Sequence, residues 1–153
     1  MSVSLTRKAA MGAVVMGIFA VSPIVAPATA EASGTSSLQP PLACDGFSCY
    51  GYDPATTVSS IDGQRCDAGA YTPAGAGVAT PQGYVELSYG PHCHAKWARI
   101  SGSSPGTWFW VQSITGSDQQ SYLPADATEG HTRMVNGYPT ARAGDIGGHT
   151  AYY

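Results

Sequence analysis

The sequence predicts an all-β protein, a small antiparallel β-sandwich or open barrel that is stapled by disulfides and has no long helix in its mature part. Three observations predict this fold class. The 153-residue chain contains 19 glycines and 11 prolines, which favour turns and interrupt helices. Apolar and polar residues alternate over short runs, as in half-buried strands. Four cysteines lie between positions 44 and 93, a spacing that allows cross-links within one small body.

The N-terminus has the pattern of an export signal over residues 1–30. Positive charge at residues 6–8 precedes an uncharged, largely apolar run over residues 9–28. Residues 28–30, Ala-Thr-Ala, fit the small-x-small pattern of signal cleavage. The rival interpretation is a retained anchor, because the run reaches the length of a short membrane span. We expect a secreted, extracellular protein whose mature form begins near Glu31.

The net charge of the mature chain limits the classes of partner that it can bind. Cleavage of the signal removes Arg7 and Lys8 and leaves all ten acidic residues, for a mature net charge of −5. Nucleic acids and anionic membranes both need basic surface on a protein. We therefore expect neither nucleic acid nor membrane as a partner.

Residues 31–43 form a leader of small and proline residues, and residues 44–153 form one β domain. The leader has no periodicity, so one interpretation is a flexible tail left by processing. The other is an extended docking peptide whose leucines fill pockets on a partner. Its candidate contact residues are Leu38, Pro40, Pro41 and Leu42.

The first expected strands are residues 66–72 and 83–90, joined by a hairpin loop over residues 73–82. In residues 83–90 apolar and polar side chains alternate, so the two faces differ. An even number of cysteines in an exported chain indicates two disulfides, for which three pairings are possible. The hairpin would bring Cys66 back beside Cys93, so we favour Cys44–Cys49 with Cys66–Cys93.

A metal site is the rival interpretation of the same cysteines. His92 and His94 flank Cys93, and zinc binds both residue types. However, no two cysteines have the C-x2-C spacing, and exported thiols normally oxidise. We therefore expect neither metal nor cofactor.

The second half of the chain adds further strands. Residues 97–100 and 107–115 are expected to be extended, and residues 116–130 to form a polar connection. In residues 107–115, Trp108 and Trp110 share one face of the strand. Asn136-Gly137 has the composition of a type I′ turn and predicts a hairpin around it.

Catalytic signatures are weak. No G-x-S-x-G elbow is present, and the possible triple of Ser48, Asp53 and His131 is one that any chain rich in serine offers. The acids available for sugar hydrolysis are spread over loops and strand ends, where carboxylates usually cap turns. We therefore expect that the protein is not an enzyme. The acids concerned are Asp53, Asp62, Asp67 and Glu86.

The aromatic residues are the stronger signal. Three tryptophans and nine tyrosines exceed what a small core needs. Core packing is one interpretation, and an exposed platform that grips a protein or stacks on sugar rings is the other. Trp97, Trp108 and Trp110 are therefore candidate partner-binding residues.

Four segments carry a resemblance to a known family. They are CDGFSCYGYDPATT, RCDAGAY, GYVELSYGPHCHAKWARI and HTRMVNGYPTARAG, in this order. The pattern is C-x4-C-x-G-x-D-P, then a cysteine, then L-x-Y-x-P-x-C-x-A-x-W-A-R. The residues on it are Cys44, Cys49, Gly51, Asp53, Pro54, Cys66, Leu87, Tyr89, Pro91, Cys93, Ala95, Trp97, Ala98 and Arg99. This pattern resembles a small secreted actinobacterial family of unknown function.

Members with a comparable signal and leader resemble the adaptor subunit of Streptomyces umbrella toxin particles. In those antibacterial assemblies the adaptor joins a lectin-like subunit to a large, repeat-bearing toxin subunit. The resemblance implies a secreted, non-enzymatic adaptor with other secreted proteins as partners. The alternatives are a secreted protease inhibitor, for which residues 101–106 offer a loop, and a carbohydrate-binding module.

Overall fold

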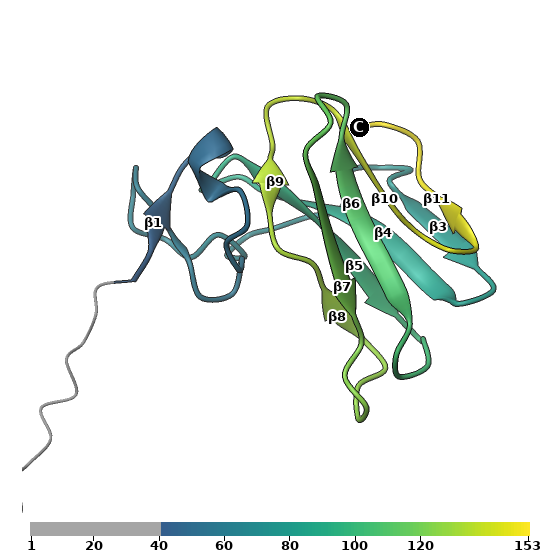
Figure 1. The fold of residues 1–153 in the computed structure, drawn as a ribbon. Helices are drawn as coiled ribbons and strands as arrows, with labels where there is room; N and C mark the ends of the chain where they lie inside the picture. Colours follow the sequence, from purple (N-terminus) through teal and green to yellow (C-terminus); the bar gives the residue numbers. More distant parts are fainter. Residues whose placement is uncertain (1–40) are drawn as a thin grey trace, which may run out of the picture. The chain divides into compact units, whose positions relative to one another are not determined.

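Two antiparallel sheets packed face to face form the body of the protein, so the predicted all-β sandwich is confirmed (Figure 1). The structure is a computed structural model, and it describes residues 41–153. The first sheet has the order β3-β4-β5-β8, with β9 also paired to β5, and the second has the order β11-β10-β6-β7. The strands of the first sheet are β3 (Gly77–Thr80), β4 (Gly83–Gly90), β5 (Ala95–Ser101), β8 (Gly130–His131) and β9 (Val135–Asn136). Those of the second are β6 (Trp108–Ser113), β7 (Asp118–Tyr122), β10 (Ala141–Asp145) and β11 (Gly148–His149).

The core lies between the two sheets and follows from the alternation in their long strands. Val85 and Leu87 on β4 point inward and are fully buried. Phe109 and Val111 on β6 meet them from the other sheet, and both are also buried. Successive side chains of a strand point to opposite faces, so Trp108 and Trp110 lie on the outer face of the second sheet.

The chain changes sheets three times. β3, β4 and β5 form a meander, after which β6 and β7 build the second sheet as a hairpin. The chain then returns to the first sheet for β8 and β9, and crosses again for β10 and β11. As a result of these crossings, the first sheet combines strands from residues 77–101 with strands from residues 130–136.

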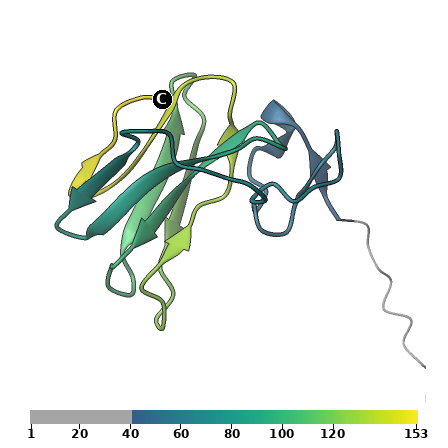
Figure 2. The same cartoon turned by 180° about the vertical axis from the view of Figure 1, so that it is seen from behind.

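Residues 41–72 form an irregular lobe at one end of the sandwich (Figures 1 and 2). The lobe contains β1 (Ala43–Cys44), the 3-10 turn η1 (Gly46–Cys49) and β2 (Val58–Ser59). β1 and β2 pair in parallel over two residues. Turn residues occupy most of the rest, in keeping with the many glycines and the Asp53-Pro54 step.

Three local predictions were wrong. Residues 66–72 form turns rather than a strand, and the partner of β4 is β3, inside the stretch expected to be a loop. β7 lies inside residues 116–130, although its sequence, DQQSY, has no buried side chain that would mark a strand. Asn136-Gly137 does not turn a hairpin: β9 pairs with β5, and β10 pairs with β6 in the other sheet.

Candidate functional site

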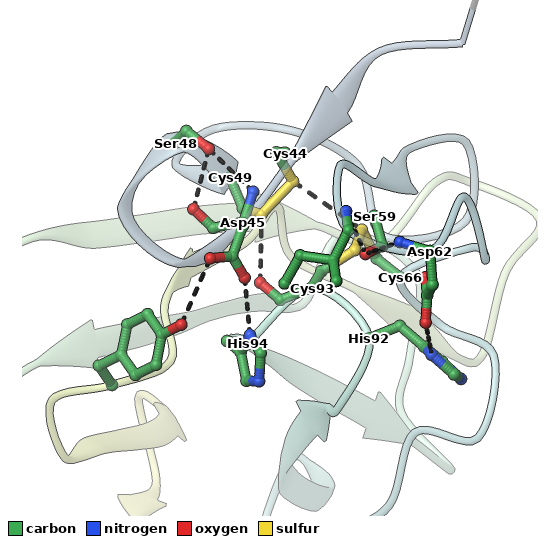
Figure 3. Close-up of polar contacts among 12 residues, drawn as sticks. Cys44, Asp45, Ser48, Cys49, Ser59, Asp62, Cys66, His92, Cys93 and His94 are labelled. Atoms are coloured by element: carbon green, nitrogen blue, oxygen red, sulfur yellow. Dashed lines mark hydrogen bonds and ion pairs between the residues drawn. A yellow bond between two sulfur atoms is a disulfide. The ribbon is translucent and has the colours of Figure 1, made fainter.

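Two disulfides form the centre of the lobe (Figure 3). Cys44 bonds to Cys49 and Cys66 to Cys93, which confirms the favoured pairing. All four side chains are buried, and the sulfur atoms of Cys44 and Cys66 lie 3.9 Å apart. Cys44–Cys49 lies within the lobe, and Cys66–Cys93 links the lobe to the turn between β4 and β5.

The expected hairpin is not what brings Cys66 to Cys93. A single antiparallel bridge between Tyr71 and Tyr89 holds the lobe against the end of β4. Gly90 lies in close contact with the backbone oxygen of Cys66, where a Cβ atom would collide. The close approach of Cys66 to Cys93 therefore depends on a glycine and on one pair of backbone hydrogen bonds, and not on a second long strand.

The four sulfur atoms lie within 4.8 Å of one another, close enough to share a metal ion. However, cysteine binds metals as a thiolate, and each of these sulfurs is bonded to another sulfur. The neighbouring His92 and His94 point to different carboxylates, as Figure 3 shows. The described geometry therefore uses these groups as cross-links and ion pairs.

Three histidine–aspartate pairs connect the lobe to the sandwich. The distances are 2.7 Å from His92 Nδ1 to Asp62, 2.6 Å from His94 Nδ1 to Asp45, and 3.3 Å from His131 Nε2 to Asp53. The three aspartates belong to the lobe, and the histidines belong to the β4–β5 turn and to β8. These pairs fix the lobe on the end of the sandwich at three points.

Two hydrogen bonds hold the Asp62 carboxylate. The backbone N–H of Gln64 donates to it at 3.0 Å, and His92 lies against its other oxygen. These hydrogen bonds stabilise the charged form, so they lower the pKa of Asp62 from its ordinary value.

The hydrogen bonds of the possible catalytic triple join only two of its members. Asp53 and His131 lie together, but the hydroxyl of Ser48 donates to the backbone oxygen of Asp45 within the cap of η1. The remaining acids also have local partners. Arg65 pairs with Asp67, and Thr72 donates to Glu86.

The outer face of the second sheet gathers aromatic and polar side chains, and we call it the tryptophan face. Strand register places them in rows, because residues directly opposite on antiparallel strands share a face. Trp108 lies opposite Tyr122, and Trp110 lies between Gln120 and Gly144. Asp118 and Arg142 flank Gln112 in the next row.

Both tryptophans are half-buried, while Tyr122 is 67% exposed. A Cβ atom on Gly144 would lie 2.6 Å from the Trp110 ring, so the glycine makes room for this ring to lie on the sheet. A hollow of about 300 Å³ lies among these side chains, lined by Trp108, Trp110, Gln112, Asp118, Gln120 and Arg142.

Polar contacts hold this face in one arrangement. The guanidinium of Arg142 donates to Gln112 at 2.8 Å and lies 5.4 Å from the centre of the Trp110 ring. It also lies 4.9 Å from the ring of Tyr152. Trp108 Nε1 donates to Gln120 at 3.2 Å. The tryptophan face therefore presents aromatic rings whose polar neighbours are already positioned.

Trp97 does not join this face, and its prediction as a contact residue was wrong. Its side chain is 3% exposed and packs with the disulfides and Met134. It forms part of the wall of a polar hollow of about 320 Å³ between the lobe and the first sheet, together with Ser88 and Arg99. Trp97 lies on the opposite face of β5 from Ala98, where the lobe covers it.

The leader residues lie at the edge of the described chain. Leu38 and Pro40 fall outside residues 41–153, while Pro41 and Leu42 are exposed. The backbone oxygen of Leu42 accepts a hydrogen bond from Val58, so the chain enters β1 at this residue. The loop offered for protease inhibition is exposed only in part, since Ser103 within it is buried.

Several residues of the tryptophan face were not foreseen from the sequence. Gln112 could have been predicted, because it follows Trp108 and Trp110 at the same two-residue spacing along the strand and so shares their face. Arg142, His149 and Tyr152 could not, since they reach this face only through the pairing of β10 and β11 beside β6.

Comparison with known proteins places the chain in a family. A family model described as a protein of unknown function, DUF2690, matches residues 47–144, which is more than half of the chain. The chain belongs to the DUF2690 family. The match spans the folded body from η1 to β10. No curated protein and no solved structure matches the chain. Within the part that the structure describes, no helix of this DUF2690 protein is long and apolar enough to cross a membrane.

Proposed function

We propose that the protein is a secreted, non-catalytic adaptor that binds other secreted proteins. The observation that carries this proposal is the tryptophan face. Its rings come from Trp108, Trp110, Tyr122 and Tyr152, and those of Trp110 and Tyr152 lie against one arginine, Arg142. Tryptophan, tyrosine and arginine are the residue types that contribute most to binding at protein interfaces.

The fixed arrangement of the side chains on the tryptophan face also supports a role in protein binding. Arg142 is already held by Gln112 and by two rings, so it loses little freedom when a partner covers it. Arg142 and Asp118 lie in the row next to Trp110, on either side of Gln112. A partner would contact mainly ring surface, with polar groups at the rim.

An adaptor needs a second contact, and residues 38–42 are the candidate. Leu42 is 51% exposed beside Pro41. An extended segment of this kind can fill pockets or add a strand to a partner. By the resemblance to the umbrella toxin adaptor, the two partners would be a lectin-like subunit and a large repeat-bearing toxin subunit.

Export to the extracellular space is the setting of this proposal. The disulfides support it, because such bonds form and persist in oxidising compartments. In a cell exterior that contains proteases, two cross-links within residues 44–93 would protect a lobe that has little regular structure.

The proposal is tested by affinity purification from culture supernatant, with bound proteins identified by mass spectrometry. Trp110→Ala should reduce recovery of one partner at least tenfold, the loss expected for a central aromatic contact. Leu38→Ser with Leu42→Ser should reduce recovery of the other partner and spare the first. Ile61→Ala, a 65% exposed apolar residue on the lobe, is the matched control and should change neither. Unchanged recovery of every partner by all three variants would reject the adaptor function.

Carbohydrate binding is the second candidate, and the hollow beside the two tryptophans favours it. Rings with amide, carboxylate and guanidinium groups beside them could stack on a sugar and bond to its hydroxyls. A glycan array separates the two functions: glycan binding that Trp110→Ala abolishes would support this candidate, and an array without signal would reject it.

A further inference from the structure

A second aromatic surface lies away from the tryptophan face, and we call it the tyrosine groove. It is an open groove of about 480 Å³ beside the end of β4 and the start of β5. Four tyrosines from distant parts of the sequence line it, together with Pro73, Lys96 and Gly137: Tyr71, Tyr89, Tyr138 and Tyr153.

The rings of this groove are fixed by their neighbours. Tyr71 and Tyr89 meet edge to face, with ring centres 5.6 Å apart. Tyr138 stacks on His94 at 5.2 Å and donates its hydroxyl to Asp45. Tyr71 and Tyr138 are nevertheless 53% and 65% exposed, so their ring faces are open to a ligand.

A buried lysine lies at the base of the groove. Lys96 is 7% exposed, and its ammonium donates to the backbone oxygens of Pro139 at 2.9 Å and Tyr153 at 2.8 Å. A lysine ammonium has three N–H donors. Within residues 41–153 the third donor has no acceptor, so it can bond to a ligand. A buried charge with one free donor favours a strong acceptor in the groove.

The rest of the lining offers further donors in its tyrosine hydroxyls. The hydroxyls of Tyr71, Tyr89 and Tyr153 make no hydrogen bond within the described chain. Burial raises the pKa of Tyr89, with a smaller contribution from Tyr71, so this hydroxyl keeps its proton. None of the side chains that line the groove is a carboxylate.

We propose that the tyrosine groove binds a proline-rich, extended segment of a partner protein. Proline supplies a carbonyl acceptor and no N–H donor, so it suits a surface that offers donors and ring faces. In the polyproline II conformation the carbonyls have no internal partners and the chain loses little entropy on binding. A sugar fits less well, because its hydroxyl donors would find no side-chain carboxylate among the lining residues. This inference does not depend on the function of the tryptophan face.

The test is an NMR titration of the isotope-labelled protein, processed as its host processes it, with a capped ten-residue polyproline peptide. We expect saturable shifts that centre on the groove, at Tyr71, Lys96 and Tyr138. A capped peptide of alternating glycine and serine, of the same length, should cause no saturable shift. No saturable binding of polyproline, equal binding of the two peptides, or shifts centred on the tryptophan face would each overturn the proposal.

Variants assign the binding to the groove. Tyr138→Ala should weaken polyproline binding roughly tenfold, as for an interface hot spot. Lys96→Met, which keeps the length of the stem and removes the donors, should also weaken it. Tyr122→Ala, at an equally exposed tyrosine of the other sheet, is the control and should bind as the parent does. Retained dispersion of the core amide signals shows that each variant is folded, and full affinity in both groove variants would reject the assignment.

The chain's own leader is the alternative occupant. Replacing Pro40 and Pro41 by serine should leave the groove signals of the free protein unchanged. Movement of those signals on this substitution would show that the leader already fills the groove, and the proposal of a partner's segment would fall.

Discussion

The two disulfides should differ in how much they stabilise the fold, although they lie side by side. Cys66–Cys93 closes a loop with a sequence separation of 27, and Cys44–Cys49 one of 5. A cross-link lowers the entropy of the unfolded chain by an amount that grows with the logarithm of loop length. This relation gives about 3.6 kcal/mol for the first bond and about 2.1 kcal/mol for the second at 25 °C, a difference of about 1.5 kcal/mol.

The comparison is clean because all four sulfurs share one buried cluster. Replacing either pair by alanine removes two buried sulfur atoms from the same surroundings, so the packing losses are similar and largely cancel. The assay is urea unfolding followed by tryptophan fluorescence, with the free energy of unfolding extrapolated to water. If the variant without Cys44–Cys49 were as unstable as the variant without Cys66–Cys93, or less stable, loop entropy would not be the main contribution of these bonds.

Three further predictions concern the core, the lysine and the tryptophan face. Phe109→Ala should lower the free energy of unfolding by about 3–5 kcal/mol in the same urea assay, because it leaves a cavity between the sheets. Burial lowers the pKa of Lys96, so the folded protein binds fewer protons than the unfolded chain between that lowered pKa and 10.5. Stability should therefore rise with pH through this window, and Lys96→Met should remove the rise when unfolding is measured at successive pH values. Gly144→Val should displace the Trp110 ring and shift its fluorescence, since the new Cβ would lie 2.6 Å from it.

Strand prediction succeeded where burial on one face leaves a mark in the sequence. β4 and β6 alternate between core and outer face, and both were predicted as strands with two different faces, although the sequence left open which face of β6 is buried. β7 was not predicted as a strand, because it is an edge strand paired only with β6 and none of its side chains is buried. An edge strand that buries nothing has no hydrophobic pattern to find.

The Asn136-Gly137 step shows the limit of local turn chemistry. The dipeptide favours a tight hairpin, yet Gly137 donates to the backbone oxygen of His94 and β9 adds to β5. A Cβ atom on Gly137 would collide with this backbone, so the glycine serves a close approach between strands. The pairing of β9 with β5, and not the local preference of the Asn-Gly dipeptide, determines the backbone conformation at this step.

The amino-acid sequence by itself determined the all-β class, the favoured disulfide pairing and the placement of Trp108 and Trp110 on one shared face. These follow from composition, cysteine spacing and alternation, which act over a few neighbouring residues. The tertiary structure alone decided that Trp97 is buried, and which side chains join each aromatic surface. Both depend on the lobe covering one sheet and on strands pairing across long separations, and such contacts leave no periodic trace in the chain.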